Sequence, residues 1–327
     1  MGIVSAPFNR PARRRTYFAP AIHTPGDIMI RRRTPFLALA LLSGVIAAST
    51  AEAQLSDNLG ALTGDNAKGY LGPLPKALSS TLNSAVFQTG NVPKNTFNLS
   101  LGVRVMGVGF SDDSRTYKPT PPPGFTPTQD VTPSTIIGST TAVAQSGQGG
   151  TTLYHPGGFD INEFAVAVPQ LTIGSVFGTR AVVRWVSLDL GDSDFGKFEY
   201  LGFGAQHSIS QYFPGLPVDL AAGFFSQAFE IGDGLIKTDA LMFNVTGSKR
   251  MGMLEPYAGL GWDTFDMDVA YKSTTTPGDN IAIKFDKESN AHLTLGIQAL
   301  LGFTRLSAEL DIAAETGAAV GLSLGRY

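Results

Sequence analysis

The feature that most constrains the fold is a repeated alternation of apolar with polar or small residues between Phe97 and Tyr327. In the clearest stretch, Ala291–Phe303, positions 293, 295, 297, 299 and 301 are all aliphatic, whereas His292, Thr294 and Gln298 lie between them. A period of two predicts a β-strand whose two faces meet different surroundings. An aliphatic face opposite a polar face is typical of a wall between lipid and a polar lumen. The sequence therefore predicts an all-β fold, an antiparallel transmembrane β-barrel.

Ten alternating stretches predict about ten strands. Eight or twelve strands remain open, because Asn280–Phe285 can form a separate hairpin arm. Pro169 lies inside one stretch and indicates a sheet edge or a bulge there. The expected strands are Phe97–Phe110, Glu163–Ile173, Thr179–Leu190, Lys197–Ser210, Val218–Ile231, Leu235–Ser248, Leu254–Tyr271, Asn290–Gly302, Thr304–Ala313 and Ala318–Tyr327.

The lengths of the links between these strands support a barrel. If the first strand starts on the periplasmic side, the odd-numbered links are extracellular, where loops are usually long. The first link, Ser111–Asp160, is dense in Pro, Thr, Ser and Gly, so we expect a long disordered extracellular loop. The seventh link, Lys272–Ser289, is also long and polar. The even-numbered links near Ser175, Arg250 and Phe303 are short, as periplasmic turns are.

The N-terminal region has the pattern of an export signal. Arg31–Arg33 precede the apolar run Phe36–Ala48, and Ala51-Glu52-Ala53 forms an A-x-A cleavage site. These three parts predict a secretory signal peptide cleaved near Ala53, and hence an outer-membrane location in a Gram-negative envelope. Residues 1–28 are then an upstream extension, with Met1 and Met29 as the two possible starts. The alternative is a cytoplasmic tail with Phe36–Ala48 as a membrane anchor, which the cleavage site disfavours.

Composition excludes several classes of function. Residues 1–53 carry seven basic and two acidic residues, so the remainder has 17 Lys and Arg against 25 Asp and Glu, a net charge of about −8. An acidic chain is a poor nucleic-acid binder, because phosphate contacts need a basic surface. There is no cysteine, which removes disulfides, thiolate metal sites and thiol nucleophiles. We therefore expect no nucleic-acid partner, no cofactor and no metal site.

The segment 54–95 ahead of the first strand has helical spacing. Apolar residues recur every three or four positions from Tyr70 to Val86, with polar residues between them. We expect an amphipathic helix from about Lys76 to Gln88. It can lie in the barrel of residues 96–327 as a plug, close the periplasmic mouth, or pack as a simple N-terminal cap.

Three stretches carry a resemblance to a known family. They are KGYLGPLPKALSSTLNSA, QHSISQYFPGLPVDLAAGFF and EPYAGLGWDTFDMDVAY. Together they resemble an uncharacterised family of bacterial envelope proteins, described only as a domain of unknown function. The resemblance covers most of Lys68–Tyr327 and implies an outer-membrane-type barrel. It implies no activity, because the matching residues are turn glycines, prolines and aromatics.

Charged side chains gather on the predicted inward faces. One interpretation is a selectivity ring in a solute channel. The other, which the presence of both signs favours, is a small lumen filled by ion pairs. The candidate lumen-lining residues are Arg104, Arg180, Arg184, Asp219, Glu255, Asp263, His292, Arg305, Glu309 and Asp311.

An enzymatic role is not expected. His207 and Ser208 are adjacent in a strand, so they point to opposite faces and cannot act as base and nucleophile. His292 has no GxSxG-like context around a serine, which weakens the remaining possibility of a lipid-modifying barrel enzyme. Asp263, Asp266 and Asp268 lack the pattern of a cation-binding loop.

Aromatic residues near the predicted strand ends suggest interfacial girdles, where ring side chains lie at headgroup level. They are Trp185, Tyr200, Tyr212, Tyr257, Trp262 and Tyr271. The sequence thus predicts a structural or porin-like barrel for small or hydrophobic solutes. The alternative is a surface interaction or adhesion protein that uses Ser111–Asp160. Expected partners are outer-membrane lipids, lipopolysaccharide and the barrel-assembly machinery.

Overall fold

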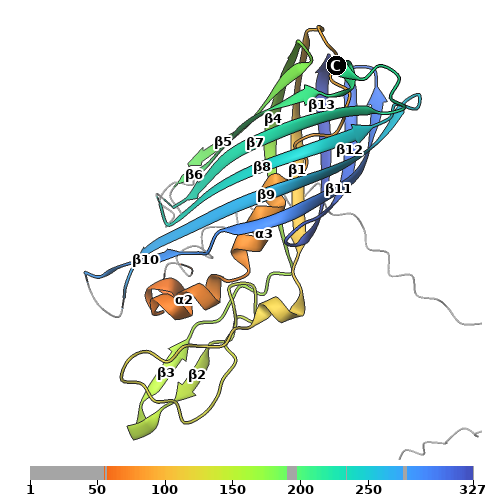
Figure 1. Ribbon diagram of the computed structural model, residues 1–327. Helices are drawn as coiled ribbons and strands as arrows, with labels where there is room; N and C mark the ends of the chain where they lie inside the picture. The colour runs from red at the N-terminus through yellow and green to blue at the C-terminus, as the bar shows by residue number, and fades with distance from the viewer. Residues whose placement is uncertain (1–54, 56, 190–196, 233, 275–277, 327) are drawn as a thin grey trace, which may run out of the picture. The chain divides into compact units, whose positions relative to one another are not determined.

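A computed structural model describes residues 55, 57–189, 197–232, 234–274 and 278–326. The predicted signal peptide, its cleavage site and Tyr327 lie outside these residues. The described residues form a closed antiparallel barrel of ten strands (Figure 1), which confirms the predicted fold. The barrel strands are β1 (Asn98–Gly109), β4 (Glu163–Val176), β5 (Thr179–Asp189), β6 (Lys197–Ser208), β7 (Asp219–Ile231), β8 (Ile236–Ser248), β9 (Leu254–Lys272), β11 (Glu288–Leu301), β12 (Thr304–Ile312) and β13 (Thr316–Arg326).

The ladder closes because the first and last strands pair. Val103 of β1 lies opposite Leu322 of β13, and Arg104 lies opposite Gly321. The eleventh strand of the sheet, β10 (Asn280–Lys284), pairs with the far end of β9 and forms an arm outside the closed ring. This arm is the separate hairpin that the sequence left open, so the strand number is ten.

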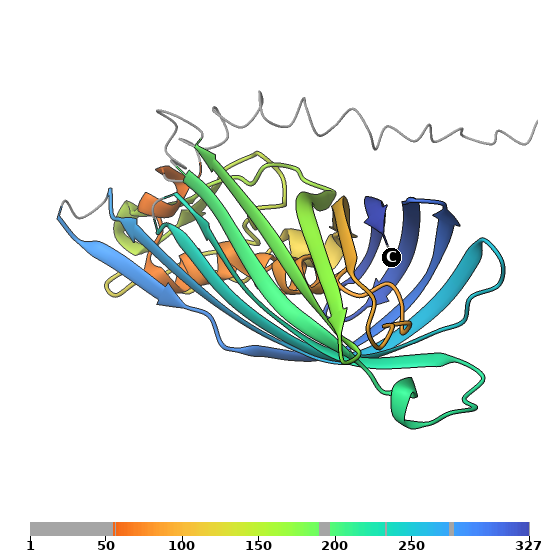
Figure 2. The same ribbon diagram turned by 90° about the horizontal axis from the view of Figure 1, so that it is seen from above.

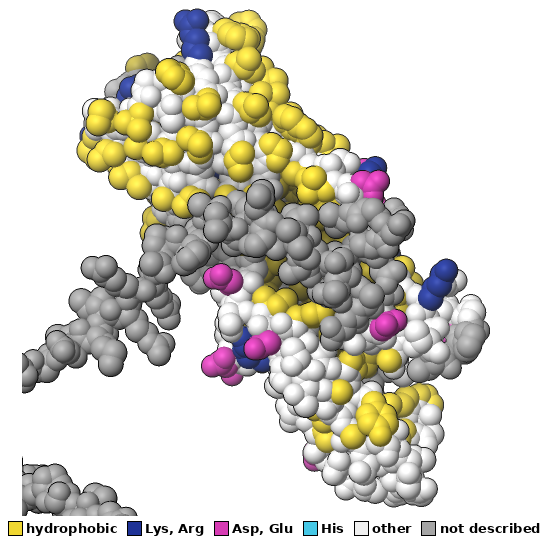
Figure 3. All heavy atoms as spheres, turned by 180° about the vertical axis from the view of Figure 1, so that it is seen from behind, with side chains coloured by type: hydrophobic (Ala, Val, Ile, Leu, Met, Phe, Trp, Pro, Cys, Tyr) yellow, Lys and Arg dark blue, Asp and Glu magenta, His cyan; other side chains and the backbone are white. Residues whose placement is uncertain are grey.

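The outward face of the barrel is apolar. Leu260 is 64% exposed, Trp262 53% and Leu295 48%, although a water-soluble core would bury such side chains. Figure 3 shows apolar side chains spread over the strands, while the acidic side chains in view lie toward one end. This surface is what a wall in contact with acyl chains requires.

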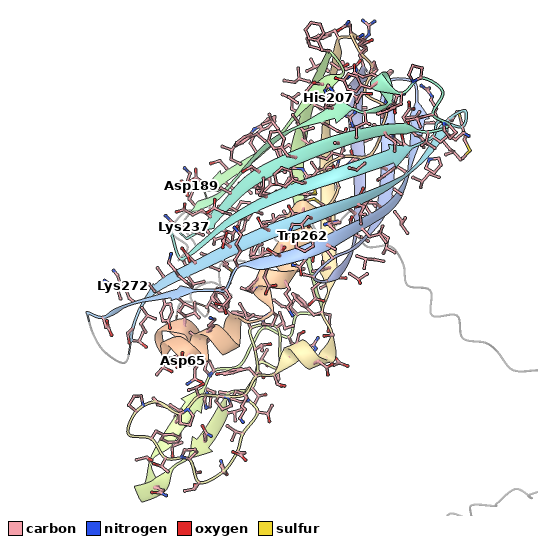
Figure 4. The ribbon with its side chains drawn as sticks, in the orientation of Figure 1. Asp65, Asp189, His207, Lys237, Trp262 and Lys272 are labelled. Atoms are coloured by element: carbon pink, nitrogen blue, oxygen red, sulfur yellow. The ribbon has the colours of Figure 1, made fainter. Side chains whose placement is uncertain are left out.

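The two ends of the barrel differ, and we name them by their links. At the short-turn end, β4 joins β5, β8 joins β9 and β11 joins β12 through few residues. At the long-loop end lie residues 110–162, the β10 arm and the charged ends of several strands. Figure 4 places His207 toward the short-turn end, and Asp189, Lys237 and Lys272 at the opposite end.

The link 110–162 is more structured than its composition predicted. It contains the hairpin β2 (Val143–Ser146) and β3 (Thr152–His155) and the short 3₁₀ helices Asp112–Arg115 and Gln148–Gly150. Backbone bonds such as Thr135 N–H to Arg115 O, 2.9 Å, hold it together. The expectation of a disordered loop is therefore wrong, because the link buries Ile136 and Ile137 in the core and joins its turns by backbone hydrogen bonds.

Pro169 marks a discontinuity in the wall. The pairing of β4 with β5 runs from the turn to Gln170 opposite Arg184 and has an irregularity near Gly174. Beyond the Gln170–Arg184 pair, the two strands no longer pair with each other. Glu163–Pro169 of β4 pairs only with β1, and Trp185–Asp189 of β5 pairs only with β6 among the described residues. Proline has no N–H to donate, so the ladder stops where the sequence indicated an edge. We call this unpaired stretch the β4–β5 seam.

Ahead of the barrel strands, the described residues include the helices α2 (Gly64–Leu71) and α3 (Leu74–Asn83). Pro75 lies in the first turn of α3, where proline is tolerated. The predicted helix Lys76–Gln88 thus begins two residues earlier and ends five residues earlier, and the residues that follow Asn83 turn away from the helix. Neither helix among the described residues is long and apolar enough to cross a membrane.

Candidate functional site: the occupied lumen

The lumen is occupied by the chain that precedes β1, which we call the lumen segment (Asp57–Thr96). It begins at the long-loop end, where the Thr274 N–H donates to Gly60 O at 2.9 Å and Tyr271 Oη donates to Leu62 O at 3.3 Å. α3 then lies inside the barrel (Figures 1 and 2). The segment ends at the short-turn end, where the Gly178 N–H donates to Lys94 O at 2.7 Å. It therefore passes through the whole lumen.

The half of the lumen near the long loops is apolar. The lumen segment buries Leu59, Leu71 and Leu82 there, and the barrel wall contributes Phe265 and Met267, all almost fully buried. Of α3, only Lys76 is well exposed, so the helix is buried on nearly all sides rather than on one amphipathic face. This packing resembles a protein core and holds the helices by apolar burial.

A buried arginine holds the C-terminal end of α3. Arg184 of β5 donates from its guanidinium to Leu82 O at 3.2 Å and to Ser84 O at 2.9 Å. It also donates to Gln170 Oε1 at 2.9 Å and lies over the Phe225 ring, 5.4 Å from its centroid. The last carbonyls of a helix lack partners within the helix and attract cations, so Arg184 caps α3 from the wall.

Glu309 of β12 lies on the inner wall just beyond the C-terminal end of α3, next to Ala85. Glu309 accepts hydrogen bonds from Tyr257 Oη at 2.6 Å and from the backbone N–H of Ala85. Ala85 has a φ of +54°, a left-handed conformation that costs an alanine free energy, and it sits where the helix gives way to extended chain. The carboxylate of Glu309 thus stabilises the point at which the segment changes conformation.

A histidine joins two carboxylates on the same inner wall. His292 Nδ1 lies 2.5 Å from Asp263 Oδ2, and its Nε2 lies 2.9 Å from Asp311 Oδ1. Thr294 Oγ1 also donates to Asp311 Oδ1, at 2.7 Å. All three charged residues are nearly fully buried. They fasten β9, β11 and β12 to one another on the inner face of the wall.

The half near the short turns is polar. Thr89 of the segment donates from its Oγ1 to Glu255 and lies 3.1 Å from Ser248 Oγ. Its carbonyl accepts from Arg180 Nη2 at 3.2 Å and from Gln206 Nε2 at 3.1 Å. Here the segment is held by hydrogen bonds, which water can replace.

The structure places the ten predicted lumen residues on the inner face, with Asp219 at the rim of the short-turn end, where it accepts from Asn91 Nδ2 at 2.9 Å. The ion pairs described among them join His292 to Asp263 and to Asp311. Arg180 and Arg184 instead donate to amide and carbonyl oxygens. The lumen is thus filled mainly by the lumen segment, and the expectation that ion pairs fill it is wrong.

Three of the predicted girdle aromatics point inward. Trp185, Tyr212 and Trp262 are exposed, but Tyr200, Tyr257 and Tyr271 are buried. The assignment of these three tyrosines to the membrane interface is wrong. Tyr257 and Tyr271 share the parity of Glu255 and Asp263, so the alternation that placed the carboxylates inward also placed the tyrosines there.

The remaining chemical candidates form no reactive group. His207 lies 2.7 Å from Thr179 Oγ1 and 2.9 Å from Tyr212 Oη, while the nitrogens of His292 face carboxylates. Asp266 and Asp268 point outward and pair with Lys287 and Lys284. In the part of the chain that the structure describes, no group of His, Asp or Glu is arranged to hold a metal ion.

The long loop packs onto the lumen segment. The Ile136 N–H donates to Tyr70 O at 2.8 Å, and Tyr70 Oη donates to Gly157 O at 3.1 Å. His155 is fully buried between Tyr117 Oη at 3.3 Å and Gln145 Oε1 at 3.2 Å, and burial lowers its pKa. Burial raises the pKa of Tyr117 and raises that of Tyr70 to about 12. The loop and the lumen segment thus pack together at the long-loop end of the barrel. Strand periodicity could not reveal this contact.

Ten closed antiparallel strands with an apolar outer face and a polar inner face define an outer-membrane-type β-barrel. A family model matches residues 31–326, and the chain belongs to that family, which is described as a family of unknown function (DUF6588). This confirms the resemblance drawn from the sequence. No curated protein matches the chain.

Several solved structures match this chain at low identity. OmpT of Vibrio cholerae is 11% identical, covering 70% of this chain and 97% of its own, with a TM-score of 0.26. The β domain of the Bordetella autotransporter BrkA is 10% identical, covering 70% and 99%, with a TM-score of 0.30. The toluene transporter TbuX of Ralstonia pickettii is 9% identical, covering 73% and 91%, with a TM-score of 0.26. No statement about activity follows from them.

Proposed function

We propose that this protein is a gated outer-membrane passage for small solutes, closed by its own lumen segment. The observation that carries the proposal is the path of Asp57–Thr96 through the barrel. With long loops outside the cell, the start of the segment lies at the extracellular mouth and its end at the periplasmic mouth. In this proposal, lipids and lipopolysaccharide surround the apolar outer face of the barrel. The barrel-assembly machinery inserts the protein into the outer membrane. The role is non-enzymatic.

The polar inner wall supports a segment that moves. A permanently filled barrel gains little from buried charge, because replacing buried ionic groups by apolar ones is often neutral or stabilising. Here the short-turn half keeps Arg180, Glu255 and Gln206 around the extended part of the segment. Such a lining is useful when water and solutes reach it. We infer that the segment leaves this half of the lumen when the passage opens.

A disulfide lock tests the gate, because the natural chain has no cysteine. Thr89 Oγ1 and Ser248 Oγ lie 3.1 Å apart, so the double substitution Thr89→Cys and Ser248→Cys can join the segment to the wall. In single-channel recordings, the oxidised double variant should stay closed, and reductant should restore openings. Each single variant is the matched control, and its openings should be the same under oxidising and reducing conditions.

Two results would defeat the proposal. Equal conductance of the oxidised and reduced double variant would mean that current does not require movement of the segment. Absence of conductance in every variant, in protein that shows the heat-modifiable gel migration of a closed barrel, would mean that there is no passage.

The β4–β5 seam favours a second candidate function, lateral transfer of apolar solutes between the lumen and the membrane. The unpaired stretch of β4 carries Val166 and Val168, whose side chains belong to the apolar lumen core. An apolar solute could therefore pass from this core to lipid without crossing the polar half. Pro169→Val should extend the ladder and reduce uptake of an apolar dye into vesicles. Unchanged uptake would rule out the seam as the route.

The contacts of the long loop favour a role in gating over a role in adhesion. Its contacts with Tyr70 and Gly69 place it over the segment, so its movement and that of the segment are linked. Protease trimming of intact cells tests its exposure: a loop that is never cut does not face the outside.

A further inference from the structure

A small polar cavity lies in the short-turn half of the lumen, between Val86–Thr89 of the lumen segment and the inner wall. Its volume is about 30 Å³. A water molecule needs about 10–15 Å³ on this measure, so the cavity has room for about two waters or one small ion. Strands on opposite sides contribute to it, including β1, β5, β11 and β12.

The charge around this cavity is positive. Arg104, Arg180 and Arg305 line it, and no acidic side chain does among the described residues. Arg180 lies within electrostatic range of Arg305, Arg104 and the carboxylate of Glu255. That carboxylate already accepts hydrogen bonds from Thr89 and from Ser248 Oγ. An arginine cannot lose its proton at physiological pH, so three of them together favour an anion.

A buried amide at the same cavity points to a ligand independently of this charge. Gln298 of β11 lines the cavity and is 2% exposed, and its Nε2 has no hydrogen-bond partner. A buried N–H donor without an acceptor is costly and rare in native structures. The hydroxyl groups of Ser100, Ser307 and Ser323 also line the cavity and can donate. An acceptor at the cavity is what the Gln298 N–H lacks.

A second cationic hollow lies at the short-turn mouth and shares a lining residue with the cavity. Arg305 also lines a wider hollow of about 400 Å³ at that mouth, together with Arg250 and Arg326. The two hollows thus share one arginine, and the outer one carries two more. Positive clefts raise the local concentration of anions and their rate of entry.

We propose that the cavity is a binding site for one small anion, either a halide ion or the carboxylate group of a small solute. Arg104, Arg180 and Arg305 supply the charge, and Gln298 supplies a directed N–H. The site goes beyond the proposed gate by giving the passage a preferred charge. Binding does not require the segment to move, so the two proposals can fail separately.

The test uses the purified full chain in detergent, in a chloride-free gluconate buffer. Chloride is titrated, and its binding is read from the broadening of the ³⁵Cl nuclear magnetic resonance line. The natural chain should show saturable broadening, and Arg305→Gln should weaken the affinity at least tenfold. Gln298→Leu should also weaken it and serves as the second variant if the first does not fold. Lys272→Gln, at the far end of the barrel, is the control and should bind like the natural chain.

Formate distinguishes the two sources of the anion. Displacement of chloride by formate supports a carboxylate ligand, whereas a site that holds chloride and ignores formate supports a halide ligand. The proposal is overturned if neither anion binds saturably to protein with heat-modifiable migration. It is also overturned if Arg305→Gln and Gln298→Leu bind chloride as tightly as Lys272→Gln does.

Discussion

Replacing Arg184 by methionine should release the lumen segment without opening the barrel wall. The guanidinium group donates to Leu82 O and Ser84 O, and methionine leaves both buried carbonyls without this donor. Each lost bond costs about 1–3 kcal/mol. Relief from burying a charge offsets part of that cost. A net loss of about 3 kcal/mol corresponds to a roughly hundredfold larger undocked population, at about 1.4 kcal/mol per factor of ten.

Amide hydrogen exchange measures this change directly. Exchange of Ala77–Ser84 should become about a hundredfold faster in the variant if opening is in rapid equilibrium, while strands such as β12 keep their protection. Arg250→Met, at an exposed turn where Arg250 donates to Gly252 O at 3.4 Å, is the control and should change nothing in the segment. Unchanged exchange of α3 would refute the capping role. Equal acceleration in all strands would show that Arg184 supports the wall instead.

Three further predictions concern the segment, the loop and the outer face. Gly90→Ala should weaken docking by about 1–3 kcal/mol in the same exchange experiment, because an added Cβ would lie 2.3 Å from Asp219 O and 2.7 Å from Thr246 O; Gly64→Ala, which meets open space, should not. The pKa of His155 is lowered, so the folded loop binds fewer protons than the unfolded loop, and its stability is present above about pH 6.5 and falls below it. Proteolysis of the loop should then be faster at pH 5 than at pH 7.5, and His155→Gln should remove the difference; a pH effect that persists in the variant would implicate another group. Leu295→Arg, on the outward face, should destabilise the barrel in vesicles by about 2–4 kcal/mol in a denaturant titration, whereas Lys237→Arg at the charged end should be neutral.

The barrel itself could be read from the sequence because every strand keeps a period of two. The parity that set Leu295 outward and His292 inward also fixed the register across ten strands, because a slip of one residue would reverse both faces. Pro169 likewise indicated where the ladder would stop. Local pattern therefore predicted the faces of the strands and about ten of them, while the place of Asn280–Lys284 outside the ring had to come from the structure.

What occupies the lumen could not be read in the same way. The helical spacing around Leu78 and Leu82 predicts a helix, but it does not say which wall the helix packs against. Arg184 was assigned to the lumen, yet its role depends on two carbonyls about a hundred residues away in the chain. The order of the long loop was missed because its hydrogen bonds join distant turns. The tyrosines Tyr257 and Tyr271 were the exception, since parity alone could have placed them.

The central claim is that the lumen segment fills the barrel. Thiol labelling tests this claim most directly. Thr89 is buried in the lumen, and Tyr154 is 68% exposed on the loop. In outer-membrane vesicles, a membrane-impermeant thiol reagent should label Tyr154→Cys rapidly and Thr89→Cys slowly. Labelling of both positions at the same rate would contradict the account, because position 89 would then face an open, water-filled lumen.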